Sequence, residues 1–219
     1  MQDQNKNIVT VPLIWAYSHD GAIASDIISL KNFQHADLFL MIGAVTKAAA
    51  VTVKKGVSVS SCATALAFTR FFKTGFVLDY DGASNDVVES AEAAFTGAGG
   101  GAGVVYKDLG SRIIGYEYNG TTFVDNETVT FTTSGRTVVA NGIQKNEDIL
   151  IPMVATSNTF NIEAVENRLY KIPISADMLG DGYDCICLNI ADADTTLYAA
   201  WANLTPRYFA EVPETALYD

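Results

Sequence analysis

The chain has 219 residues, of which 49% are hydrophobic and only 18% are charged, so a disordered protein is excluded and one large or two small folded domains are expected. Its formal net charge is −11, from 25 acidic and 14 basic residues. This surplus would repel a phosphate backbone, so nucleic acid is not an expected partner.

Period-two alternation of apolar and polar residues recurs in short segments rich in β-branched and aromatic residues, which predicts strands. In chain order the expected strands are Ile8–Ile14, Ser25–Ser29, Ala36–Gly43, Val51–Val59, Ala67–Phe72, Val104–Tyr106, Ile113–Tyr118, Thr128–Thr133, Asp148–Pro152, Thr159–Ile162, Arg168–Ile174, Cys185–Ile190 and Thr195–Ala202. Asp-Gly and Asn-Gly pairs between them favour tight turns. The pattern predicts an all-β fold with a β-sandwich or jelly-roll-like core.

Two regions depart from the strand pattern. Asn85–Phe95 predicts a helix, because its apolar residues recur at helical spacing after an Asn or Asp cap. A single helical turn is expected at Ile162–Asn167 or at Ser175–Leu179. None of these segments is long enough to organise the fold.

The glycine-rich run Gly97–Gly103 has the composition of a phosphate-binding loop. It lacks the Lys-Ser/Thr of such loops and precedes a strand instead of a helix, so a flexible connector is the preferred interpretation. The run also suggests a boundary between two regions. The expected organisation is a β-sandwich core formed by residues 1–84 plus 147–219, with residues 85–146 as a β-rich insertion.

The cysteines and the N-terminal residues favour a protein made in the cytoplasm. Cys62, Cys185 and Cys187 are expected to be buried free thiols, and Cys185 and Cys187 are expected on opposite faces of one strand, which argues against a disulfide between them. The segment before Gly21 has no basic region and no apolar run long enough for a signal or a span. Neither export nor a membrane partner is therefore expected.

No catalytic signature is present. The two histidines, His19 and His35, fall neither in a nucleophile elbow nor in a zinc-protease helix. Ser18, His19 and Asp20 remain an alternative catalytic set, although neighbours in sequence rarely form a triad. The chain is therefore not expected to be an enzyme, and no catalytic residues are assigned.

Two acidic clusters are the best metal candidates: Asp177, Asp181 and Asp184 in DMLGDGYD, and Asp192 and Asp194 in IADADT. Calcium needs several oxygen ligands around one point, and an Asp-rich loop with glycine at its bend can supply them. The EF-hand spacing is absent, and acidic residues beside Asp-Gly commonly form turns. No metal or other cofactor is therefore expected, with a calcium site left as the alternative.

Most aromatic residues are expected to fill the space between two sheets, because each buries a large area. A carbohydrate-binding module would use similar residues exposed on one face, and Trp15 or Trp201 would serve there. This function stays open as an alternative.

Two parts of the chain resemble the auxiliary or decoration proteins of tailed-phage heads. One part comprises GAIASDIISLKNFQHADLFLMIGAV and VTVKKGVSVSSCATALAF, and the other is NRLYKIPISADMLGDGYDCICLNIADADTTLYAAWANLTPRYFAE. The resemblance implies a virion protein whose β-sandwich binds the major capsid protein on the capsid surface as a homo-oligomer, often a trimer. A tail or neck component is the nearest alternative.

The C-terminal segment Pro206–Asp219 is the candidate for a capsid or oligomer contact. It follows the last expected strand and offers Pro206, Arg207, Tyr208 and Phe209, of which the basic and aromatic types are favoured at interfaces. The alternative is that Tyr208 and Phe209 close the sandwich.

Overall fold

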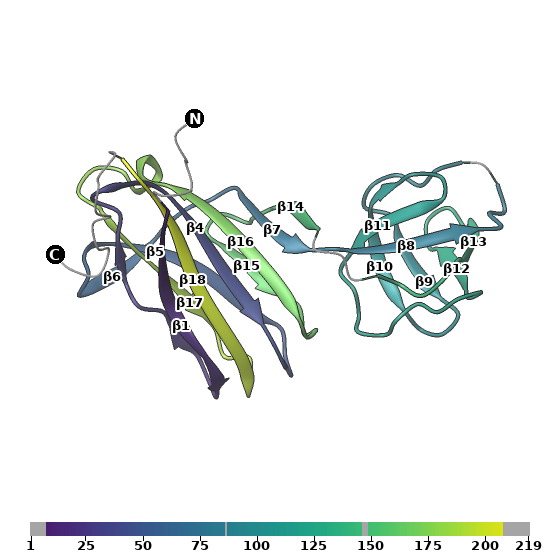
Figure 1. Cartoon of the computed structure of the whole chain (residues 1–219), viewed down its shortest axis with the longest axis horizontal. Coiled ribbons are helices and arrows are strands. Elements are labelled where there is room, and N and C mark those ends of the chain that lie inside the picture. Colours follow the sequence, from purple (N-terminus) through teal and green to yellow (C-terminus); the bar gives the residue numbers. More distant parts are fainter. Residues whose placement is uncertain (1–7, 86, 146–148, 208–219) are drawn as a thin grey trace. The chain divides into compact units, whose positions relative to one another are not determined.

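The computed structural model describes residues 8–85, 87–145 and 149–207 (Figure 1). Strands dominate the described chain, which confirms the all-β class. The strands are β1 (Val9–His19), β2 (Ile23–Ala24), β3 (Ile28–Ser29), β4 (Phe33–Ile42), β5 (Ala49–Ser58), β6 (Ser61–Ala65), β7 (Arg70–Thr74), β8 (Phe76–Asp81), β9 (Ala94–Gly97), β10 (Ala102–Asp108), β11 (Arg112–Tyr116), β12 (Thr128–Phe131), β13 (Thr137–Ala140), β14 (Leu150–Val154), β15 (Thr159–Ile162), β16 (Arg168–Ser175), β17 (Cys185–Ile190) and β18 (Thr196–Pro206). A 3-10 helix, η2, covers Ala176–Leu179.

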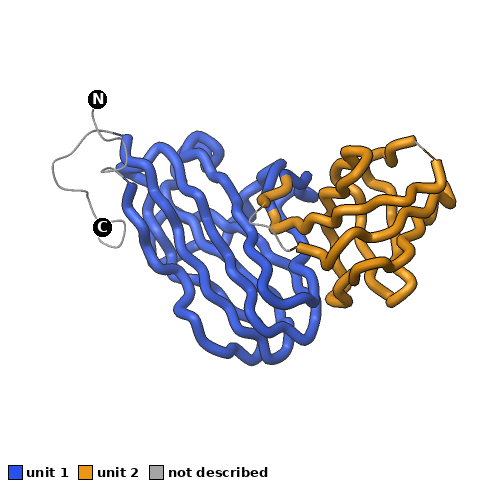
Figure 2. The backbone as a smooth tube through the Cα atoms, turned by 45° about the vertical axis from the view of Figure 1, so that its right-hand side comes forward, with its two compact units in different colours: residues 1–72, 152–219 blue, residues 73–151 orange. Residues whose placement is uncertain are grey.

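The chain divides into two compact units (Figure 2). We call residues 1–72 and 152–219 the sandwich unit, and residues 73–151 the barrel unit. The boundaries therefore differ from the expected insertion of residues 85–146. The physical reason is β8, which was expected to belong to the core but pairs with β11 and β13 of the barrel.

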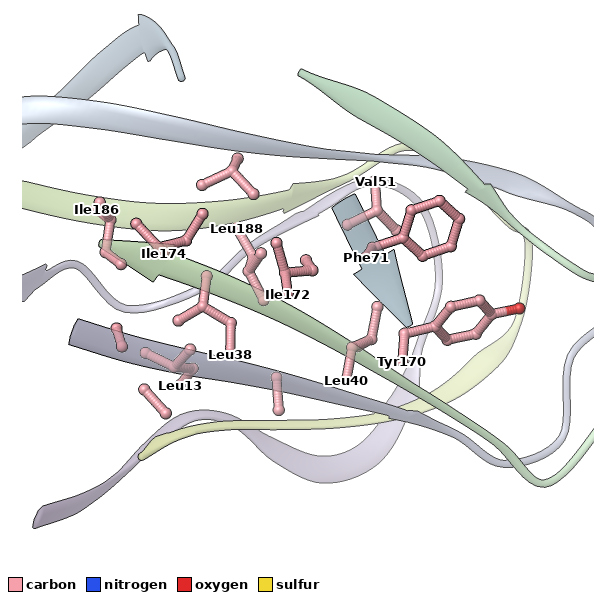
Figure 3. Packing of buried hydrophobic residues seen from close by; sticks show 14 of the residues in the cluster. Leu13, Leu38, Leu40, Val51, Phe71, Tyr170, Ile172, Ile174, Ile186 and Leu188 are labelled. Carbon is pink, nitrogen blue, oxygen red and sulfur yellow. The ribbon is translucent and has the colours of Figure 1, made fainter. Parts of the chain in front are cut away.

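The sandwich unit contains two sheets. Sheet A has the strand order β1-β18-β4-β16-β7-β14, and sheet B has the order β15-β5-β17-β2, with β3 added to β17 and β6 to β5. Side chains from the inner faces interdigitate, for example Leu38 and Leu40 of β4 with Ile172 of β16 and Leu188 of β17 (Figure 3). Alternate residues of β4 and β16 are buried, as period two requires, and the remaining residues form an outer face of sheet A.

The barrel unit is a closed barrel with the strand order β10-β11-β8-β13-β12-β9. Its centre is aromatic, with Phe76, Phe95 and Phe123 in mutual ring contact. Gly103 and Gly115 make room for Phe76, because a Cβ on either glycine would lie 2.6 Å from its Cζ. Among the described strands β8 to β13, closure leaves no free sheet edge.

The glycine-rich run is a tight hairpin in the barrel unit, so its interpretation as a flexible connector and boundary was wrong. It joins β9 to β10, and the amide of Gly97 donates to the carbonyl of Gly101 over 2.7 Å. The amide of Gly99 donates to the carboxylate of Glu127, which is buried. A Cβ at Gly97 would meet that same carboxylate, so a larger residue there would have to displace the Glu127 side chain.

The helix expected at Asn85–Phe95 is absent from its described residues, which exclude position 86. Glu92 has a φ of 68°, which breaks a right-handed helix, and Phe95 lies in β9. The single turn expected at Ser175–Leu179 is confirmed by η2, whereas no helix forms at Ile162–Asn167. Among the described residues, no helix is both long and apolar enough to cross a membrane.

The cysteine thiols are free, as expected, with Cys185 and Cys187 buried and Cys62 half-buried. The expectation that Cys185 and Cys187 face opposite sides of their strand was wrong. Ile186 and Leu188 of β17 point into the core, and residues two apart on a strand share a face. Both cysteines therefore lie on the outer face of sheet B.

Candidate interaction surface

Four side chains form a row across the outer face of sheet A. The strand register places Pro12 of β1 beside Trp201 of β18, Trp201 beside Phe39 of β4, and Phe39 beside Lys171 of β16. The rings of Phe39 and Trp201 stack with centroids 5.2 Å apart and an interplanar angle of 9°. We call Pro12, Trp201, Phe39 and Lys171 the aromatic row.

Charges beside the aromatic row neutralise one another. The ammonium of Lys171 lies 5.7 Å from the ring centroid of Phe39 and 3.0 Å from a carboxylate oxygen of Asp37. The other oxygen of Asp37 lies 3.1 Å from Nε2 of His35. The charges next to the stacked rings therefore nearly cancel.

Strand β1 adds exposed aromatic rings at the edge of sheet A. Two register shifts interrupt its pairing with β18, so Leu13 and Ile14 are both buried and Trp15 turns outward. Trp15 is 70% exposed and Tyr17 is 56% exposed. Large rings with this exposure are typical of surfaces that contact another molecule.

An open polar depression of about 480 Å³ lies at one end of sheet A. Its lining residues are Gln34, His35, Ser175, Ala176, Asp177 and Arg207. Arg207 is attached to its own chain twice, because its amide donates to the carbonyl of Asn32 over 2.9 Å and its Nε donates to the carbonyl of Phe33 over 3.0 Å.

The four candidate contact residues differ in where they lie in the structure. Pro206 ends β18, paired with Phe33, and Arg207 lines the depression. Tyr208 and Phe209 lie outside the described residues. The expected contact segment is therefore anchored at its start to the same sheet that carries the aromatic row.

Ser175 and His35 line the depression and Asp37 lies beside His35, but these three residues do not have the geometry of a triad. Ser175 and His35 are register partners, and Asp37 contacts Nε2 of His35. Within the described part of the chain, the Ser175 hydroxyl makes no hydrogen bond to His35. A serine nucleophile needs such a bond to lose its proton, so this arrangement does not activate Ser175.

The alternative set of Ser18, His19 and Asp20 is not assembled either. Ser18 and His19 are consecutive in β1, so their side chains leave opposite faces of the strand. The His19 ring instead packs against Tyr17, with centroids 3.8 Å apart.

The acidic clusters do not converge on a point. Asp184 accepts a hydrogen bond from the thiol of Cys185, Asp192 accepts one from the amide of Asp194, and Asp177 lies at the depression. Across residues 8–85, 87–145 and 149–207, no group of three or more His, Cys, Asp or Glu side chains could hold a metal ion. Asp181 belongs to the turn that contains Gly182.

The expected division of the aromatic residues into core and surface was partly right. Phe33, Phe68 and Phe71 are buried between the sheets, whereas Phe39 and Trp201 are half-buried on the outer face. The alternation within FQHADLFLMI contains the missed signal, because Phe39 shares its phase with Asp37 and not with Leu38 and Leu40.

Comparison with known proteins gives little information about the function of this chain. No protein-family model and no curated protein matches the chain. One solved structure that matches is the crystal structure of the SPBc2 prophage-derived protein YomS, at 6% sequence identity, with 91% of this chain and 94% of that chain covered and a TM-score of 0.29. At this TM-score the likeness carries no inference about function.

Proposed function

We propose that this chain is a non-enzymatic structural protein of a tailed-phage particle, which decorates the outer surface of the capsid as a symmetric oligomer. The aromatic row on sheet A is the observation that carries the proposal. A preformed, stacked and nearly neutral surface suits protein–protein contact, since interface centres are rich in aromatic residues and poor in charge. The phage-head resemblance of residues 21–68 and 167–211 supports the location and the trimeric state.

The occupant of the aromatic row is a second copy of this chain. Each copy has a net charge of −11, so two copies repel each other over most of their surfaces. They can approach where charges are few and paired, as they are around Phe39 and Trp201, with Lys171 bound to Asp37. Closed symmetry then repeats one contact in every subunit of the oligomer.

The capsid contact is assigned to the segment that begins at Pro206 and Arg207. Its start lies at the end of β18, and Arg207 contributes a positive charge to a chain whose net charge is −11. Several weak contacts, one from each subunit, add their effects when an oligomer binds a lattice. Tyr208 and Phe209 remain predictions as parts of this contact.

Sedimentation equilibrium tests the oligomer. The wild-type chain should behave as a trimer, and Trp201→Ser should shift it toward the monomer without loss of its circular dichroism spectrum. Val154→Ser is the matched control, because Val154 is 85% exposed on β14, at the opposite edge of sheet A from β1. A wild-type monomer at all concentrations, or an unchanged trimer after Trp201→Ser, would refute the proposed contact.

Screening for activity tests the non-enzymatic part of the proposal. Pure protein should show no reproducible turnover of ester, peptide, glycoside or phosphate substrates. Turnover that disappears on His35→Ala, or on changes at His19 or Asp20, would refute it.

A carbohydrate-binding module is the second candidate, favoured by the exposure of Trp15 and Tyr17 on β1. Sugar rings stack on exposed aromatic faces in such modules. A glycan array separates the two functions: binding that is lost in Trp15→Ala would favour the module, whereas wild-type protein that binds no glycan favours the structural role.

A further inference from the structure

The outer face of sheet B holds a cysteine cluster that takes no part in the proposed function. Cys185 and Cys187 project from β17 on this face, and Cys62 lies in β6. Strand β5 separates β6 from β17, and Gly56 of β5 pairs with Cys62 on one side and with Cys185 on the other. In a flat sheet, thiols on strands two apart would not meet.

The missing side chain of Gly56 allows β6 to approach β17 more closely than a flat sheet would permit. A Cβ at Gly56 would lie 1.8 Å from the carbonyl oxygen of Ser61 and 2.8 Å from the Cα of Cys62. The backbone of β6 therefore crosses over the outer surface of β5, where a side chain would otherwise stand. The register of β6 is also shifted on both sides of Gly56, as a strand that bends out of the sheet requires.

This crossing brings the thiol of Cys187 against Cys62. The Sγ of Cys187 lies 3.7 Å from the carbonyl oxygen of Cys62. The proximity of the two residues lowers the pKa of Cys187, as does the nearby ammonium of Lys54, whereas the same proximity and burial raise the pKa of Cys62. Cys185, by contrast, donates to the carboxylate of Asp184 over 3.1 Å.

We propose that Cys62 and Cys187 are a redox modification site, which a small-molecule disulfide converts to an intramolecular disulfide. One of the two sulfurs attacks the small disulfide as a thiolate, forms a mixed disulfide and releases one thiol, which takes the proton of that cysteine. The sulfur of the other cysteine then attacks the cysteine sulfur of the mixed disulfide, and the second thiol leaves with the remaining cysteine proton. Two electrons and two protons pass to the small disulfide.

The new bond would fasten β6 to β17 across β5. It would close a loop from residue 62 to residue 187, which includes the whole sequence of the barrel unit. A long closed loop restricts the unfolded chain, so oxidation stabilises the sandwich unit. The thiols stay reduced in a reducing cytoplasm and oxidise after release into oxidising surroundings.

Peptide mapping after incubation with oxidised glutathione tests the site. After alkylation and tryptic digestion, Cys62 lies in residues 56–70, and Cys185 and Cys187 both lie in residues 172–207. The wild-type chain should yield these two peptides joined, and the titratable thiols of the unfolded protein should fall from three to one. The oxidised protein should melt at a higher temperature, and dithiothreitol should reverse the shift.

Single variants identify the sulfurs that react. Cys185→Ser is the matched control and should still form the linked peptides, whereas Cys187→Ser and Cys62→Ser should not. The site is refuted if the wild-type chain keeps three free thiols under conditions that oxidise a dithiol peptide. A bond from Cys62 to Cys185, or one between two chains, would refute it equally.

Discussion

Gly56 shows how one missing side chain determines the path of a strand. Replacing it with alanine would force a Cβ against the backbone of Ser61, and backbone atoms cannot yield as a flexible side chain does. We expect Gly56→Ala to destabilise the chain by about 3 kcal/mol or more. Urea denaturation followed by tryptophan fluorescence measures this change, since Trp15 and Trp201 both belong to the sandwich unit.

Val57→Ala provides the control for that measurement, because Val57 follows Gly56 on β5 and is exposed. Its effect should stay within about 0.5 kcal/mol, as for most surface substitutions. Equal stabilities of Gly56→Ala and the wild type would mean that β6 does not cross β5 at this point.

Asp108 is a fully buried carboxylate in the barrel unit. Its carboxylate accepts hydrogen bonds from the Tyr80 hydroxyl over 2.7 Å and from Arg136 over 2.8 Å, and the Asp108 and Arg136 side chains are 0% and 2% exposed. Burial raises the pKa of Asp108, but hydrogen bonds from the Glu89 and Gly110 amides, Tyr80 and Arg136 outweigh it and hold the pKa below 3.8.

Because the pKa of Asp108 is lowered in the folded state, the free energy of unfolding should decrease as the pH is lowered. The carboxylate stabilises the fold above its unfolded pKa of 3.8, and this stability is lost as the pH falls through the lower folded pKa. Asp108→Asn should cost about 3–5 kcal/mol at neutral pH, because it leaves Arg136 buried without its counter-ion. The variant should also lose part of the acid dependence of the wild type.

Amide hydrogen exchange between pH 3 and pH 7 locates this effect. Protection should fall across residues 73–145 of Asp108→Asn and be retained in the sandwich unit, which serves as the internal control. Uniform loss of protection in both units would contradict the assignment to the barrel.

At the scale of elements, the sequence predicts strands well where one face is buried. β15 and β17 begin and end where period two places them, because their alternate residues pack on the core. β8 was missed because Phe76, Val77, Leu78 and Tyr80 are all buried, so it shows little alternation. β6 was missed for the opposite reason, since it has little burial to mark it.

The segment before β9 shows tertiary structure overriding local propensity. Its Ala and Glu residues favour a helix, but Phe95 enters the aromatic centre of the barrel as part of β9. Strand β9 pairs with β10 and β12, and no local sequence pattern predicts these partners. Contacts distant in sequence therefore decide this element.

Deleting the barrel unit tests the division of the chain. The amide of Gly75 donates to the carbonyl of Ile149 over 2.8 Å, so a short Gly/Ser linker can replace residues 76–148. The product should melt cooperatively, since β7 and β14 remain in sheet A. Tryptophan fluorescence and gel filtration measure the outcome.

A second deletion, of residues 85–146, is compared with the first to locate the boundary between the two units. It leaves β8 without β11 and β13, and exposes its buried apolar side chains. This shorter deletion should aggregate while the longer one stays soluble. Equal behaviour of the two proteins would place the boundary elsewhere.

At the scale of the whole molecule, truncation after Thr205 tests the assignment of the capsid contact. It removes the two hydrogen bonds of Arg207 to Asn32 and Phe33, but β18 keeps its pairing with β1 and β4 up to Thr205. The truncated chain should fold and should no longer bind capsids in a pelleting assay. Normal occupancy after truncation would show that the segment is not the contact.

The interaction surface could be predicted from the sequence only in part. Trp15 and Trp201 were recognised as candidates for an exposed face, but their neighbours were not, because the aromatic row joins residues 12, 39, 171 and 201 through strand register. Register depends on which strands become neighbours. A single sequence does not contain that information in a local pattern.

Imaging of the intact particle tests the central proposal most directly. Cryo-electron microscopy of phage particles that carry this chain should show copies of the two-unit chain around symmetry axes on the outer capsid surface, and particles made without the chain should lack that density. Particles that contain the chain only in the tail or neck, or not at all, would contradict the proposed role.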